Sequence, residues 1–402
     1  MPYEIIWQVL VILVIAVLLG ELFEQFGLPS VAGALLSGLL LGPTILNVVT
    51  MNTQINAVST ISLFFIVFLI GFQMRTETLR KNLPKASIVT LTSFVIPFSI
   101  AIFLSLHLFR FGPVADVILA LSISAPSISI ISVMVMQFGL LESVVGQIIL
   151  ASVAITDIGA FVFLAAISQS ASNTILLLLY LGIFLGAYVL VDYFLNRRTR
   201  SFQLMLNKTS KYLKSEDISY AILIAIGLLL SFIFQAIGIS YILGAFFAGL
   251  ILHEELIGRE SFGRISRTLG RFNRGFFIPL FFGFAGVQAS LLSGYLSLIP
   301  LALLVAVTIG VAIFLTYVGV MNLFKSNKGL SSSEMRTAAH QISVILSGRG
   351  AVGIIIVSVS LTYGLISNQA YSLVIVATTV ISITAPMLLG RQMKRQVPIS
   401  ED

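Results

Sequence analysis

The chain has 402 residues, of which 58% are hydrophobic and only 10% are charged, and its mean hydropathy is +1.07. A soluble domain carries about 25% charged residues, so this composition excludes a soluble globular protein and predicts a polytopic membrane protein. The net charge of +7 does not indicate a nucleic-acid partner, because Lys and Arg lie in short gaps between apolar runs. The lack of cysteine excludes disulfides and thiolate metal sites.

Apolar runs follow one another along the whole chain. A spanning helix needs about 20 apolar residues, and the chain holds about thirteen such runs, with no strand-like alternation that would indicate a barrel. We therefore predict an all-α polytopic bundle, and we interpret the first run as a membrane helix rather than a cleavable signal peptide. The runs are centred near residues 13, 38, 64, 97, 126, 157, 183, 227, 247, 284, 309, 350 and 378.

The basic residues predict the orientation of the chain. They cluster after the third, seventh, ninth, eleventh and thirteenth runs, whereas the gaps after even-numbered runs hold almost none, with Arg110 as the exception. Because Lys and Arg favour the cytoplasmic side, we expect the N-terminus outside and the C-terminus in the cytoplasm, in the plasma (inner) membrane of a prokaryote. No gap is long enough for a soluble domain. We expect one transmembrane domain over residues 1–395 and a short cytoplasmic tail at 396–402.

Two runs contain residues that interrupt a helix. In "LSISAPSISIIS" Pro126 lies between Ser124 and Ser127, and in "ILSGRGAVGII" Arg349 lies between two glycines. Proline removes a backbone donor and clashes with the preceding turn of a helix. The fifth run therefore contains one predicted break, and the twelfth run contains the other.

The positions of these breaks predict an internal repeat. Transporters with inverted repeats place discontinuous helices at corresponding positions of their two halves, with the substrate site beside them. Helices two to six and nine to thirteen then form two inverted five-helix repeats, at about residues 30–170 and 238–390. A linker helix and a basic loop, at about residues 172–217, join the repeats.

Two formal charges are predicted at mid-membrane depth, Asp157 in "ASVAITDIGAFVFLAA" and Arg349, whereas Glu21, Glu24 and Asp116 fall at helix ends that water reaches. An ionisable residue inside the membrane indicates an ion or proton path by default. Burial disfavours the charged form of a carboxylate and a bound cation favours it, so Asp157 can hold a proton or a cation but not both. Such competition, with alternating access, is sufficient for antiport. The alternative is a protonated carboxyl that hydrogen-bonds to a neighbouring helix.

Hydroxyl groups near these charges are candidates for completing an ion site. Thr156 either ligates an ion or holds Asp157 in place, or else bonds back to its own helix. Ser124 and Ser127 flank the first break, where hydroxyls and freed carbonyls suit a hard cation, or they satisfy those backbone groups locally. Arg349 either compensates the C-terminal ends of the half-helices or pairs with Asp157 in an empty state.

Four stretches carry a resemblance to a known family. They are "ELFEQFGLPSVAGALLSGLLLGPTIL" (21–46), "LFFIVFLIGFQMRTETLRKN" (63–82), "GISYILGAFFAGLIL" (238–252) and "GRGAV" (348–352). In this order and spacing they resemble the monovalent cation:proton antiporter superfamily, in particular its second family, the Na⁺/H⁺ and K⁺/H⁺ exchangers. The resemblance implies a sodium/proton antiporter-like fold with crossed broken helices, a homodimer and an elevator-like movement. It also matches the family's ion-binding aspartate to Asp157.

Two departures from the family pattern concern charge. Electrogenic members commonly have Asp before the ion-binding aspartate, and many electroneutral ones have Asn or Gln, whereas this chain has Thr156. Many members carry a Lys before the Arg-Gly segment, where this chain has Thr316 and Tyr317 in "FLTYVGVM". With one titrating carboxylate, we expect electroneutral exchange of Na⁺ (or K⁺ or Li⁺) for H⁺, without a cofactor and without enzymatic activity. The alternatives are a K⁺/H⁺ antiporter, a gated K⁺ efflux channel lacking its regulatory domain, or a membrane sensor.

Overall fold

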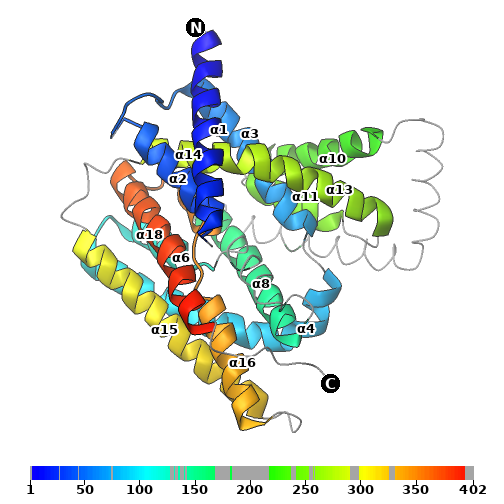
Figure 1. Ribbon diagram of the computed structural model, residues 1–402, viewed down its shortest axis with the longest axis vertical. Coiled ribbons are helices and arrows are strands. Elements are labelled where there is room, and N and C mark those ends of the chain that lie inside the picture. Colours follow the sequence, from blue (N-terminus) through cyan, green and yellow to red (C-terminus); the bar gives the residue numbers. More distant parts are fainter. Residues whose placement is uncertain are drawn as a thin grey trace. The chain divides into compact units, whose positions relative to one another are not determined.

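The regular elements of the protein are helices throughout the part of the chain that the structure describes, as predicted. The structure is a computed structural model (Figure 1). It describes residues 2–26, 28–43, 45–73, 76–126, 131, 135, 140, 143–167, 182, 217–236, 241–252, 257, 259–289, 298–325 and 331–393. Ser127, almost all of the seventh run and the tail at 396–402 lie outside the described residues.

The chain divides into two compact units, and each is described by itself. Unit 1 comprises residues 1–56, 77–161 and 279–402, and unit 2 comprises residues 57–76 and 162–278. Unit 1 holds all or most of α1 (Pro2–Gln25), α2 (Ser30–Leu41), α4 (Thr76–Thr90), the π-helical turn η1 (Leu91–Val95), α5 (Ile96–Leu108), α6 (Pro113–Ser124), α8 (Val144–Ile167), α14 (Ile278–Gln288), α15 (Leu298–Lys325), α16 (Ser332–Ile345), α17 (Ala351–Thr362) and α18 (Asn368–Met393). Unit 2 holds most of α3 (Thr53–Gln73), together with α10 (Asp217–Ala236), α11 (Tyr241–Ile251), α13 (Arg259–Phe272) and the π-helical turn η2 (Asn273–Phe277).

Helices lie at each predicted run that the structure describes. Among the described residues, five helices are long and apolar enough to cross a membrane, and shorter apolar helices lie at six further places. The long ones are Glu4–Gln25, Thr53–Gln73, Asn82–Leu108, Val144–Ile167 and Ile299–Leu323. The total of about thirteen spanning helices stays a prediction.

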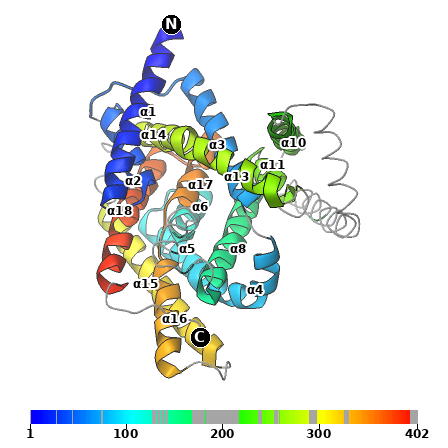
Figure 2. The ribbon, with the colours of Figure 1, turned by 45° about the vertical axis from the view of Figure 1, so that its right-hand side comes forward.

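Glycines bring α2 and α14 into close contact within unit 1 (Figure 1 and Figure 2). A Cβ added to Gly38 would lie 1.9 Å from the carbonyl oxygen of Gly283, and one added to Gly286 would lie 2.3 Å from the carbonyl oxygen of Leu35. Small residues at membrane helix interfaces allow backbones to approach in this way. The contact is reciprocal, because each helix presents a glycine to the backbone of the other.

Within unit 2, α3 and α11 make a contact of the same kind. A Cβ on Gly71 would lie 2.1 Å from the carbonyl oxygen of Phe246, and one on Gly249 would lie 2.1 Å from the carbonyl oxygen of Phe68. Here too each helix offers a glycine to the other helix's backbone. A larger side chain at either glycine would force the helices apart.

The glycines of the two crossings occupy matching positions in sequence. "VAGALLSGLLL" in α2 aligns with "ILGAFFAGLIL", which forms most of α11, so that Gly33 and Gly38 correspond to Gly244 and Gly249. A Cβ on Gly33 would lie 2.4 Å from a backbone oxygen of α1, and one on Gly244 would lie 2.8 Å from a backbone oxygen of α10. The pair α1–α2 in unit 1 therefore packs like the pair α10–α11 in unit 2, which was not predicted, since the proposed repeats began one helix later.

Candidate functional site

Asp157 lies in the middle of α8 and is completely buried. Neither of its carboxylate oxygens has a hydrogen-bond partner among the described residues. An unpartnered buried polar group costs about 1–3 kcal/mol, and more when it is charged. The carboxylate therefore needs a neutralising proton or cation whenever it is closed off from water.

A hydrogen-bonded contact fixes α8 against α4 one and a half turns before Asp157 (Figure 2). The Ser152 carbonyl accepts from the hydroxyls of Thr90 at 3.1 Å and Thr156 at 2.9 Å. The Ser152 hydroxyl lies 2.7 Å from the Ile148 carbonyl of its own helix and 3.3 Å from the Ala86 carbonyl of α4, and its one hydrogen is shared between these acceptors. The bond from Thr156 to Ser152 is the back-bond that formed the alternative interpretation of Thr156. A hydroxyl that donates one hydrogen bond still has lone pairs that can accept or ligate.

The two predicted breaks meet in the structure. α6 ends at Ser124, α16 ends at Ile345, and α17 begins at Ala351. Between them, Pro126 and Arg349 form an isolated antiparallel β-bridge. The hydroxyl of Ser124 is buried and has no partner among the described residues, so an oxygen ligand is available where α6 stops.

The Arg349 side chain joins the second break to η1. It is fully buried, and its Nη1 donates to the carbonyl of Leu346 at 3.0 Å while its Nη2 donates to the carbonyl of Ser93 at 3.2 Å. Leu346 is the C-cap of α16, and cations stabilise the negative end of a helix. The carbonyl of Ser93 cannot accept the i+4 bond of an α-helix, because Pro97 four residues later has no N–H. This geometry favours the role of charge compensation for Arg349.

One continuous stretch, α4 with η1, therefore contacts both the Asp157 helix and the second break. Thr90 reaches α8, and Ser93 reaches Arg349. In contrast, no hydrogen bond links Asp157 to Thr156, Ser124 or Arg349 in this conformation, since both Asp157 oxygens lack partners among the described residues. Ser127 lies outside those residues.

Asp116 departs from expectation, because it is only 1% exposed rather than accessible to water. It lies in the first turn of α6, and its Oδ1 accepts a hydrogen bond from the hydroxyl of Ser105 on α5 at 3.1 Å. Its Oδ2 has no partner within the described part of the chain. Hydropathy gave its depth correctly as a helix end, but the packing of α5 on α6 excludes water there.

Among the buried hydroxyls that lack a hydrogen-bond partner in the described residues, those of Ser93 on η1 and Thr316 on α15 were not singled out for an ion site. α15, which carries Thr316, touches η1 closely, since a Cβ on Gly319 would lie 2.8 Å from the Thr92 side chain. Hydroxyls in apolar helices usually bond back to their own helix, so the sequence gives no signal that these two do not.

The chain is similar to known proteins over nearly its whole length. A family model described as "Sodium/hydrogen exchanger, transmembrane" matches residues 10–394. The Na⁺/H⁺ antiporter of Enterococcus hirae is 25% identical over 96% of this chain and 97% of its own length. The K⁺/H⁺ antiporter 1 of Saccharomyces cerevisiae is 24% identical over 95% of this chain and 46% of its own length. Among solved structures, the sodium proton antiporter MjNhaP1 of Methanocaldococcus jannaschii matches with a TM-score of 0.66 at 16% identity, covering 98% of this chain and 97% of that one.

Proposed function

This chain belongs to the sodium/hydrogen exchanger family of membrane transporters, and we propose that it is a secondary-active antiporter exchanging Na⁺ for H⁺ through Asp157. It is a transporter and not an enzyme. The observation that carries the proposal is the fully buried Asp157 carboxylate, whose two oxygens have no hydrogen-bond partner among the described residues. A group in that state binds a proton or a cation, and the two compete for the same oxygens.

The break in the fifth run supplies further oxygen ligands in this proposal. Hard cations prefer oxygen, and discontinuous membrane helices coordinate ions with unwound carbonyls and hydroxyls. The unpartnered hydroxyl of Ser124 supports its inclusion. Thr156 contributes a lone pair while it donates to Ser152, and we include Ser127 from the sequence pattern alone. Arg349 compensates the C-terminal end of α16, and in this proposal it keeps its hydrogen bonds to the carbonyls of Leu346 and Ser93 throughout the cycle.

Alternating access in this proposal is an elevator-like movement between two inverted repeats. The matching glycine crossings α2–α14 and α3–α11 support the repeat. In an inverted repeat α2 corresponds to α11 and α3 corresponds to α14, so exchanging the members of each pair converts one crossing into the other. The equivalent packing of α1–α2 and α10–α11 extends the repeat to six helices on each side of the seventh. The homodimer and the movement itself rest on the family resemblance.

Orientation and charge balance complete the proposal. We place the protein in the inner membrane of a prokaryote with the N-terminus outside and the C-terminus in the cytoplasm, from the distribution of Lys and Arg. One carboxylate that binds either one cation or one proton gives electroneutral exchange. K⁺ is the alternative cation, favoured by the name of the Saccharomyces relative. A channel would instead produce single-channel currents.

The test is proton flux in proteoliposomes that contain a pH-sensitive dye. Addition of Na⁺, K⁺ or Li⁺ outside should release protons from the lumen in the wild type and not in Asp157→Asn, while size-exclusion profiles of the two proteins agree. Asp116→Asn is the matched control, because it makes the same change at another buried carboxyl. The asparagine keeps an oxygen that can accept the hydrogen bond from the Ser105 hydroxyl, and this variant should retain exchange. Exchange that survives in Asp157→Asn would overturn the proposal. A rate that depends on a potential imposed with an ionophore would overturn electroneutrality.

A further inference from the structure

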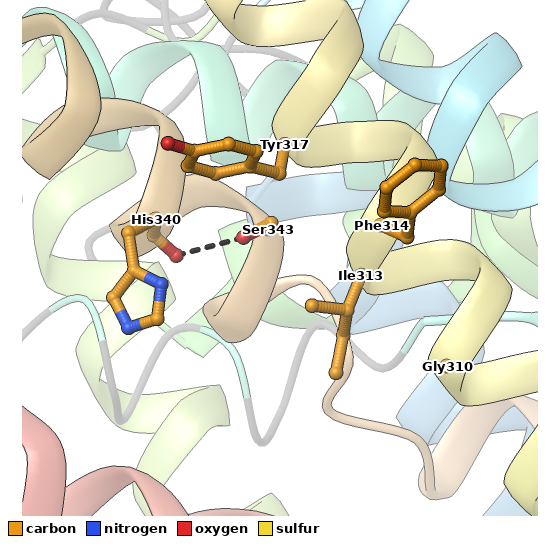
Figure 3. Close-up of a pocket in the computed structure, with 6 residues that line it drawn as sticks. All are labelled: Gly310, Ile313, Phe314, Tyr317, His340 and Ser343. Atoms are coloured by element: carbon orange, nitrogen blue, oxygen red, sulfur yellow. Dashed lines mark hydrogen bonds between the residues drawn. The ribbon is translucent and has the colours of Figure 1, made fainter.

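A pocket of about 390 Å³ opens between α15 and α16 (Figure 3). It is lined almost wholly by apolar atoms. Its lining residues are Gly310, Ile313, Phe314 and Tyr317 from α15 and His340 and Ser343 from α16. The two helices are antiparallel neighbours in unit 1, and the proposed ion site does not use these residues.

The sequence of α15 explains the hollow. The four lining residues of α15 have the spacing i, i+3, i+4, i+7 of one helix face and span about 10 Å of that helix. A Cβ added to Gly310 would meet no heavy atom within 4 Å, so the glycine leaves space that a side chain could occupy. Phe314 beside it is 66% exposed. On a membrane-spanning helix such a surface faces lipid acyl chains.

A polar stripe leads into the same pocket from the start of α16. Arg336, His340 and Ser343 have the spacing i, i+4, i+7, so they share one face of the helix. Arg336 is exposed. Figure 3 shows the His340 ring and the Tyr317 ring at one end of the pocket, with Gly310 toward the other. The Ser343 hydroxyl donates to the His340 carbonyl at 2.9 Å, and the imidazole of His340 and the hydroxyl of Tyr317 are the other polar side-chain groups at that end.

This end of the pocket lies on the predicted cytoplasmic side. In sequence, Lys325 ends α15, Lys328 lies in the gap before α16, and Arg336 lies in the second turn of α16. Ile345, the last residue of α16, adjoins the second break, which is predicted at mid-membrane depth. Arg336 lies nine residues before Ile345, about 14 Å along the helix, and half of the hydrocarbon core is about 15 Å thick. Basic pockets between membrane helices on the cytoplasmic side bind anionic head groups. The arrangement therefore places Arg336 at head-group level, with His340 about 6 Å deeper and an apolar hollow at acyl-chain level.

We propose that the α15–α16 pocket binds an anionic phospholipid of the cytoplasmic leaflet, with one acyl chain along the Gly310 face and the phosphate against Arg336. Binding itself requires only that the chain spans a membrane. The lipid also steadies α16, whose other end is held by Arg349, and so raises the exchange rate; this second consequence rests on the proposed function.

The test compares phosphatidylglycerol with phosphatidylcholine as additives to the purified protein in detergent, with thermal stability as the readout. Phosphatidylglycerol should raise the melting temperature of the wild type and phosphatidylcholine should not. Gly310→Leu fills the hollow and should abolish the effect. Arg336→Gln should raise the lipid concentration for half-maximal stabilisation about fivefold, since a basic residue near an anionic surface contributes about 1 kcal/mol.

The matched control is Arg267→Gln, which removes one exposed charge from α13 and should leave the lipid effect intact. Arg336→Gln changes an exposed side chain and keeps the test informative should Gly310→Leu fold poorly. Equal stabilisation by phosphatidylcholine, or a full effect in Gly310→Leu, would overturn the proposal. The transport-inactive Asp157→Asn protein should still respond to phosphatidylglycerol, so a failure of the lipid site is distinguishable from a failure of the proposed transport function.

Discussion

Replacing Gly38 by alanine is expected to destabilise the protein far more than the same replacement at Gly310. A Cβ on Gly38 would lie 1.9 Å from the carbonyl oxygen of Gly283, whereas ordinary van der Waals contact begins at 3.4 Å. The clash involves backbone atoms on both helices, so rotation of a side chain does not relieve it and α2 must move away from α14. At Gly310 a Cβ meets no heavy atom within 4 Å.

The size of the difference follows from two opposing terms. Overpacking a close contact costs about 1–3 kcal/mol, and occasionally more, and separated helices lose part of their dispersion energy because a gap of about 0.5–1 Å forfeits a quarter to a half of each contact. Alanine in a helix interior is favoured over glycine by about 1 kcal/mol. At Gly310 only the favourable helix propensity of alanine applies. The two variants should therefore differ in the free energy of unfolding by about 1–3 kcal/mol.

Thermal unfolding of both variants in one detergent, followed by size-exclusion chromatography of heated samples, measures the difference. Gly249→Ala should behave like Gly38→Ala, because a Cβ there would lie 2.1 Å from the carbonyl oxygen of Phe68. If Gly38→Ala melts at the temperature of Gly310→Ala, then α2 and α14 are not in backbone contact and the reasoning is wrong.

Substitutions at three other positions test the contacts around the site and the start of α16. Arg349→Lys should lower the free energy of unfolding by about 1.5–3 kcal/mol in the same assay, because one ammonium cannot reach the carbonyls of both Leu346 and Ser93. An unchanged melting temperature would contradict a stabilising role for these two hydrogen bonds. Thr156→Val should raise the apparent KM for the cation in proteoliposomes and Thr156→Ser should not, so equal values for the two would remove Thr156 from the ion site. Two hydrogen bonds from Ser331 lower the pKa of Glu334, the one from its side chain having the larger effect and the one from its backbone the smaller. These bonds therefore stabilise the folded protein at pH values above the pKa of a free glutamate. The stabilisation is lost as the pH falls through the lowered pKa of the folded state. Melting temperatures of the wild type and Glu334→Gln should therefore differ at neutral pH and converge in acid.

The membrane helices and the two breaks were predictable because their causes are local in sequence. Long apolar runs require spanning helices, and Pro126 and the glycines around Arg349 disrupt helical hydrogen bonding wherever they occur. The meeting of these breaks in the bridge between Pro126 and Arg349 agrees with the crossed broken helices that the family resemblance implies. Asp157 was singled out as a candidate because a single charge is conspicuous in an apolar run.

The partners of these groups were not predictable, because they depend on which helix faces which. Asp116 falls at a helix end in sequence, yet α5 packs over it and Ser105 donates to it. The partner of Arg349 was expected among charges or helix ends, and one of its acceptors is the carbonyl of Ser93, far away in sequence. The spacing of the glycines in sequence does not show which helix Gly38 or Gly249 contacts; the structure does. Hydropathy gives depth along the membrane normal and carries no information about lateral neighbours.

The way Arg349 is held has a consequence for the work that a membrane potential can do on this protein. Its guanidinium donates to backbone carbonyls of Leu346 and Ser93, so its charge is constant whether Asp157 carries a cation or a proton. In the proposed cycle the part of the protein that carries Asp157 and Arg349 across the membrane then has the same net charge in the cation-bound step and in the proton-bound step. A potential of about 100 mV biases the transfer of one elementary charge by about 2.3 kcal/mol, but its effects on these two opposite steps are equal and cancel. The net exchange is then driven by the two concentration gradients alone.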